Sequence, residues 1–69
     1  MKLKLKVHVK KSATGVKVKI EVAERREPYY VGEILMRGKF PNAYSANQTT
    51  DEALRAFAPC EVEYVGQPI

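Results

Sequence analysis

The chain has 69 residues, of which 45% are hydrophobic, and it carries a formal net charge of +4. A chain of this length buries only about 60% of its unfolded surface, so residues 1–69 predict one domain without room for a cofactor cavity beside its core. The apolar content argues against disorder, and the positive charge favours an acidic partner, either a protein surface or a nucleic acid.

Residues 2–10 and 16–23 alternate between polar and apolar side chains, which predicts two β-strands with one face on a core. A turn at residues 12–15, in which Gly15 can adopt positive φ, joins them as an antiparallel hairpin. The expected core set is Leu3, Leu5, Val7, Val9, Val16, Val18, Ile20 and Val22. The register predicts three polar pairs on the outward face, which are Lys6–Glu21, His8–Lys19 and Lys10–Lys17.

A third strand is predicted at residues 29–37, because Pro28 suits the first position of a strand and not its middle. Pairing Val22 with Tyr30 would place Lys19 opposite Glu33. In this register Tyr30, Ile34 and Met36 join the core. Three apolar residues then lie among the lysines on the outward face, namely Tyr29, Val31 and Leu35.

Residues 38–48 are predicted to form a loop, with room for a short strand at residues 43–46. The run Thr49-Thr50-Asp51-Glu52 is a capping box that predicts a short helix with Thr49 as its N-cap, and Pro59 ends it. Residues 60–65 alternate again and form a final strand. The predicted fold is α+β, a single antiparallel β-sheet in the order βββ(β)αβ with one short helix packed on one face.

The sequence predicts no catalytic residue, no metal site and no cofactor. His8 is the one histidine, and it projects from a lysine-rich strand with no carboxylate opposite it in the predicted register. No Cys/His spacing resembles a zinc site, and Gly32 and Gly38 form no phosphate-binding loop. We therefore expect a protein that is not an enzyme.

Cys60 is the one cysteine, so an internal disulfide is excluded. It predicts a small buried side chain, with a disulfide-linked dimer or a reactive thiol as the alternatives. A small domain without disulfides is typical of a reducing compartment. No apolar run reaches the ~18 residues that cross a bilayer, and the N-terminal stretch lacks the apolar segment of a signal peptide. We expect a cytoplasmic protein without membrane contact.

The surplus positive charge is predicted to gather at the hairpin end of the sheet, because Glu21 and Glu33 neutralise part of the outward face. This basic end comprises Lys10, Lys11, Lys17, Arg37 and Lys39. The plain interpretation is a solvated face whose lysines discourage aggregation through sheet edges. Apolar side chains ringed by charge, here Tyr29, Val31 and Leu35, are instead typical of a protein-binding surface.

Phe40 and Tyr44 follow the basic end directly in sequence. Basic residues beside aromatic ones on a sheet are typical of proteins that bind RNA or single strands, which contact phosphates and stack on bases. A nucleic-acid-binding module is therefore the alternative function. A structural subunit that forms a homodimer through the same face is a third hypothesis, and monomer and homodimer both stay open.

Three segments carry a resemblance to known proteins, namely residues 28–33 (Pro-Tyr-Tyr-Val-Gly-Glu), 43–46 (Ala-Tyr-Ser-Ala) and 50–54 (Thr-Asp-Glu-Ala-Leu). Over about half of the chain this pattern resembles HicB-like antitoxins, which commonly have a Tyr-Tyr-Val-type strand and a Thr-x-Glu-Glu-Ala-Leu helix start on a ββ-β-α-β scaffold. Residues 50–54 with 61–65 are also similar to small phage proteins that inhibit host enzymes, including bacterial RNA polymerase.

Both resemblances imply non-catalytic inhibition directed at a protein. The leading hypothesis is therefore a small binding protein, an inhibitor or modulator, that docks its lysine-rich sheet face on an acidic protein partner.

Overall fold

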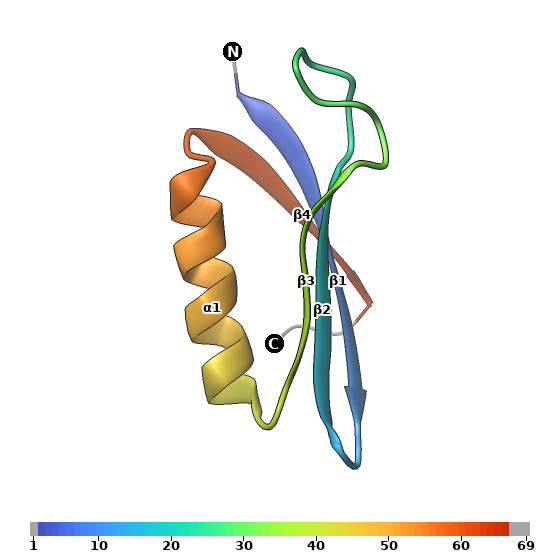
Figure 1. Ribbon diagram of the computed structural model, residues 1–69, viewed down its shortest axis with the longest axis vertical. Coiled ribbons are helices and arrows are strands. Elements are labelled where there is room, and N and C mark those ends of the chain that lie inside the picture. The colour runs from blue at the N-terminus through green and yellow to red at the C-terminus, as the bar shows by residue number, and fades with distance from the viewer. Residues whose placement is uncertain (1, 67–69) are drawn as a thin grey trace.

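The computed structural model describes residues 2–66 and shows a four-stranded sheet with one helix against one face (Figure 1). The elements in chain order are β1 (Leu3–Ser12), β2 (Gly15–Val22), β3 (Ile34–Phe40), α1 (Ala43–Ala56) and β4 (Cys60–Gly66). The sheet order is β3-β2-β1-β4, so β1 and β2 lie in the centre. The α+β class and the single helix on one face are confirmed.

The hairpin of β1 and β2 supplies most of the core. All eight residues of the expected core set are buried, together with Ala46 of α1. The hairpin register is also confirmed, with Lys6 opposite Glu21 and Lys10 opposite Lys17. Each fully buried Val, Leu or Ile side chain contributes about 1.5–3 kcal/mol, so the alternation in these two strands is the main source of stability.

The sheet is mixed, and the prediction of a purely antiparallel sheet was wrong. β4 runs parallel to β1, from the pair Leu3–Cys60 to the pair Val9–Gly66. β3 ends near the 12–15 turn, and α1 returns along the sheet to the other end, so β4 runs in the same direction as β1. β4 cannot pair with β2, because β1 and β3 already occupy both edges of that strand.

β3 begins later than predicted and pairs in a different register. Val18 pairs with Gly38 rather than with Ile34, a slide of four residues, and Lys19 therefore lies opposite Arg37 instead of Glu33. The slide places the ring of Phe40 opposite Val16, where it packs against the core.

A register irregularity between Ile20 and Glu21 exchanges the two faces at the start of β3. Ile34 lies opposite Glu21 and is exposed, whereas Leu35 packs against the core, which is the reverse of the prediction. Met36 packs against the core as expected. Tyr30 lies in the connection before β3 and is 69% exposed, so its predicted core position was wrong.

The helix starts earlier than the capping box predicts. Asn42 is the N-cap, and its side-chain oxygen accepts a hydrogen bond from the backbone N–H of Ser45 at 2.8 Å. The predicted strand at residues 43–46 is the first turn of α1, and Thr49 lies inside the helix. Asn is among the best N-cap residues, although sequence reasoning did not single out Asn42.

Candidate functional site

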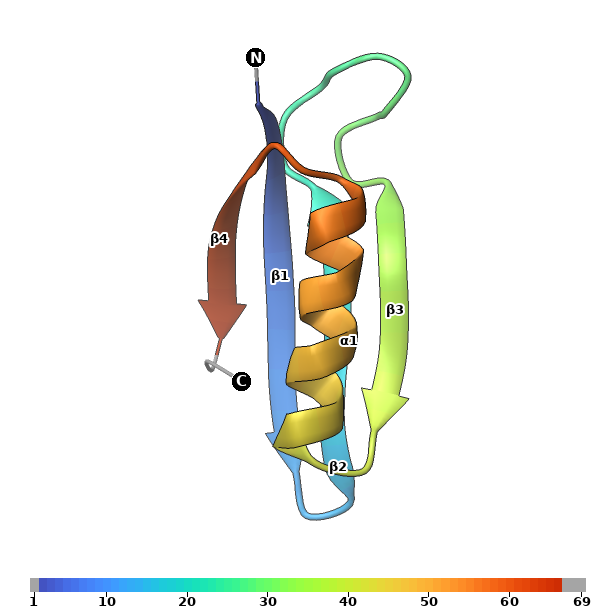
Figure 2. The ribbon, with the colours of Figure 1, turned by 90° about the vertical axis from the view of Figure 1, so that its left-hand side faces the viewer.

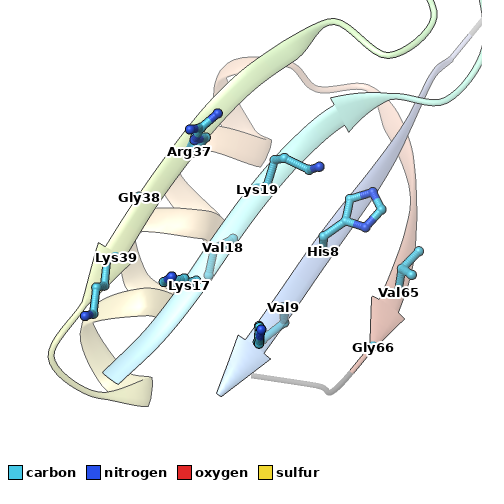
Figure 3. A pocket seen from close by; sticks show the side chains of 11 residues that line it. His8, Val9, Lys17, Val18, Lys19, Arg37, Gly38, Lys39, Val65 and Gly66 are labelled. Carbon is cyan, nitrogen blue, oxygen red and sulfur yellow. The ribbon is translucent and has the colours of Figure 1, made fainter. Parts of the chain in front are cut away.

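The face of the sheet opposite α1 carries an open hollow of about 820 Å³ (Figure 3). Its lining includes side chains of β1, β2 and β3 that point away from the core because they alternate with the buried residues. We call this surface the basic hollow, and we define it by the cations Lys10, Lys17, Lys19, Arg37 and Lys39, with His8 and Val65 beside them.

The strand register arranges these cations in two rows across the sheet. One row is Lys10, Lys17 and Lys39, and the next is His8, Lys19 and Arg37. Figure 3 shows His8, Lys19 and Arg37 on three successive strands. Like charges that lie directly opposite each other destabilise a sheet, so this arrangement carries an electrostatic penalty in the free protein.

None of the five cations is neutralised within the part of the chain that the structure describes. The ion pairs among residues 2–66 are Lys4–Glu24 and His8–Glu21. The expected pairing of Lys19 with Glu33 was wrong, because the register of β3 brings Arg37 to that position. Glu21 lies opposite Lys6 as expected, yet its carboxylate contacts His8.

His8 therefore has the acidic neighbour that the predicted register lacked. Its Nε2 hydrogen-bonds with a carboxylate oxygen of Glu21, which lies diagonally across the β1–β2 pair. Glu21 lies at the side of the hollow and forms no ion pair with any of the five cations.

The opposite end of the same face is balanced. Lys4 Nζ lies 3.0 Å from a carboxylate oxygen of Glu24, and Lys4 and Lys6 pair in register with Glu61 and Glu63 of β4. The hydrogen bond and charge of Glu24, followed by the charge of Glu61, raise the pKa of Lys4. A raised pKa means that this contribution to stability is present below the ordinary value for lysine and is lost as the pH rises through the folded value.

Four residues of the predicted basic end come together in the hollow, which are Lys10, Lys17, Arg37 and Lys39. Lys11 is exposed but pairs with Val16, so it belongs to the side of the sheet that faces α1. Lys19 is a member that sequence reasoning missed, because the predicted register neutralised it with Glu33. The correct register of β3 against β2 would have shown that Lys19 lies opposite Arg37 and belongs to the hollow.

The five aromatic and aliphatic candidates lie outside the hollow. Phe40 and Leu35 pack against the core, and Tyr29 packs edge-to-face on Phe57 with ring centroids 6.1 Å apart. Tyr44 projects from α1, on the other side of the sheet, and is 76% exposed. Val31 is exposed in the connection between β2 and β3. The predicted positions of Tyr29, Val31 and Leu35 among the lysines were wrong. Tyr29 and Val31 precede β3, which begins only at Ile34, and the register irregularity turns Leu35 towards the core.

Other chemistry is sparse in the described chain. Cys60 is half-buried, and its thiol donates to the carbonyl of Leu54 at 3.7 Å. Residues 2–66 contain no cluster of three acidic, histidine or cysteine side chains that could hold a metal ion. Within the same range, no helix has the length and apolar character needed to cross a membrane.

No known protein family, curated protein or solved structure matches this chain. The geometry and charge of the basic hollow are therefore the observations that bear on function.

Proposed function

We propose that this protein binds an acidic protein partner through the basic hollow and modulates that partner without catalysis. The supporting observation is the set of five cations that lack a counter-charge and face one another across strands, as in Lys17–Lys39 and Lys19–Arg37. Carboxylates of a partner would turn this repulsion into attraction. They would also steer the encounter of the two proteins.

A protein partner is favoured over a single-stranded nucleic acid because the described residues that line the hollow include no Phe, Tyr or Trp, and His8 is their one aromatic ring. Stacking on aromatic rings contributes about 1–3 kcal/mol per base, and Phe40 and Tyr44 lie elsewhere. Val65, which is 37% exposed, supplies an apolar contact at the side of the hollow. The resemblance to HicB-like antitoxins and to phage inhibitors favours the same proposal. The free thiol of Cys60 favours the reducing cytoplasm as the place of action.

The test compares two anionic probes by fluorescence anisotropy at low and high salt. The probes are a labelled decamer of glutamate and a labelled single-stranded thymidine decamer. We expect saturable binding of the peptide that exceeds binding of the oligonucleotide. Lys17→Glu with Arg37→Glu should weaken peptide binding by roughly tenfold or more, which corresponds to about 1.4 kcal/mol.

The matched control is Lys2→Glu with Arg25→Glu, which makes the same change in net charge outside the hollow. This variant should bind the peptide nearly as tightly as the natural chain. Tighter binding of the oligonucleotide with a steep salt dependence would identify a nucleic-acid-binding module instead. Peptide binding that survives the reversal at Lys17 and Arg37 would exclude the hollow as the site.

A further inference from the structure

β3 is an edge strand of the sheet. It pairs with β2 on one side only, and β4 forms the opposite edge (Figure 2). A free edge presents unpaired backbone N–H and C=O groups, to which an extended segment can add as a further strand. The edge of β3 is of particular interest because two cations of the basic hollow, Arg37 and Lys39, belong to this strand.

The backbone hydrogen bonds identify which residues of β3 face the open edge. The N–H of Val22 donates to Glu33 at 2.9 Å, on the β3 side, whereas the N–H of Ala23 donates to Lys4 of β1 at 2.9 Å. Along β2 the backbone N–H and C=O groups of successive residues point alternately to β3 and to β1. The even-numbered residues of β2 therefore hydrogen-bond to β3.

Their partners in β3 are Met36, Gly38 and Phe40, which use their backbone groups on β2. The residues between them, Arg37 and Lys39, therefore direct their N–H and C=O groups to the open edge.

Arg37 and Lys39 thus offer an incoming strand two kinds of contact. Their backbone groups are available to pair, and their side chains lie on the outward face, where Lys17 and Lys19 already stand opposite them. In an added antiparallel strand, the residues opposite Arg37 and Lys39 are two positions apart and lie on the same face. Each row of cations ends at Arg37 or Lys39. Acidic side chains at the two opposite positions would place a carboxylate beside the end of each row, where it would supply a counter-charge.

We propose that an extended segment of the acidic partner adds to the free edge of β3 as a fifth strand, with carboxylate side chains at alternate positions opposite Arg37 and Lys39. This inference rests on the proposed function, and it names both the form of the partner segment and its mode of docking.

Two copies of this chain are a poorer fit to the edge. Pairing β3 with β3 of a second copy would place arginine and lysine side chains directly opposite each other, which is unfavourable. β4 does carry Glu61 and Glu63 at alternate positions on the outward face. A contact of β3 with β4 of another copy, however, leaves an open edge at each end and grows without closing.

The experiment uses short labelled peptides with the full chain. The first is Thr-Glu-Val-Glu-Val-Thr, and the second has the same composition with the two glutamates adjacent. Two further versions of the first peptide are N-methylated, either at both glutamates or at both valines. In the proposed pairing the glutamate N–H groups face β3 and the valine N–H groups face away. The two methylated versions therefore have equal charge and differ only in whether their backbone N–H groups can hydrogen-bond to β3.

We expect the alternating peptide to bind roughly tenfold or more tightly than the peptide with adjacent glutamates. Methylation at the glutamates should abolish this advantage, and methylation at the valines should preserve it. Hydrogen exchange of the Arg37 and Lys39 amides should slow in the complex, while exchange of Gly38, which already bonds to β2, should change little.

Three outcomes would overturn the strand addition. Equal binding of all four peptides would support an acidic partner but would exclude backbone hydrogen bonds between the partner segment and β3. Absence of binding by every acidic peptide, including the glutamate decamer, would overturn the proposed function as well. Assembly of the free protein with rising concentration, if Glu61→Lys with Glu63→Lys abolishes it, would make β4 of a second copy the occupant.

Discussion

Lys17 lies between Lys10 and Lys39, so its ammonium group faces a like charge on each neighbouring strand. No carboxylate in residues 2–66 forms an ion pair with it. Cross-strand charge pairs change stability by about 0.2–1 kcal/mol each, and both of these pairs are unfavourable. A side chain that weakens the free protein in this way points to a role in binding rather than in folding.

Lys17→Glu should therefore stabilise the protein while it weakens binding of the glutamate decamer. Two repulsive pairs become attractive, and we expect the free energy of unfolding to rise by about 0.5–2 kcal/mol at low salt. Urea unfolding with the natural chain and Lys2→Glu as references measures this change. The gain should shrink in high salt, because these charges are exposed. A loss of stability at low salt would show that the rows of cations do not repel.

At the scale of the elements, local signals predict the register and the core face of the hairpin, although β1 extends to Ser12 where the predicted strand ends at residue 10. They predict the later elements only in part. β1 and β2 alternate without interruption and are joined by a short turn, so their register follows from the sequence. β3 has no such constraint, because a connection of eleven residues, 23–33, lets it slide past β2. The ring of Phe40 and the irregularity near Glu21 then select the register through contacts between distant residues.

The candidate site shows the same division. Lys10 and Lys17 were predictable as neighbours because they share the hairpin. Arg37 and Lys39 were placed beside them from charge and sequence position, although through an incorrect register. Lys19 was missed for that reason. The parallel pairing of β4 with β1 depends on how α1 crosses the sheet, and no local pattern reports it.

The start of α1 offers a direct test between two capping signals. Asn42→Ala should lower the free energy of unfolding by about 0.5–2 kcal/mol, because it removes the acceptor for the N–H of Ser45. Thr49→Ala should change stability little or raise it slightly, since Thr49 lies inside the helix and Ala is the better helix former. Thermal or urea unfolding of both variants decides the matter. The reverse ranking would move the start of the helix to the predicted capping box.

At the scale of the whole molecule, charge is segregated along one face and the sheet has an open edge beside the positive end. The balanced end includes Lys4 with Glu24, whereas the hollow has no such compensation within residues 2–66. The cations that we propose to bind an acidic segment would also disfavour pairing of β3 with β3 of another copy. Under this proposal, binding and resistance to aggregation depend on the same two side chains, Arg37 and Lys39.

Arg37→Val with Lys39→Val should expose an uncharged, β-prone edge and cause association that rises with protein concentration. Sedimentation velocity measures this, with Lys10→Val and Lys17→Val as the matched control on the same face. The control strands β1 and β2 are paired on both sides, so this variant should associate less. Equal association of the two variants would show that exposed apolar surface, and not the open edge, is responsible.

The parallel pairing of β4 with β1 also orders events during synthesis on the ribosome. β1 emerges early and soon meets β2, but its second side stays vacant until Cys60–Gly66 has left the exit tunnel. During that interval the nascent chain exposes a long alternating strand that any similar strand could occupy. We therefore expect the second side of β1 to be the last position in the sheet to fill, because its partner strand is the last of the four strands along the described chain.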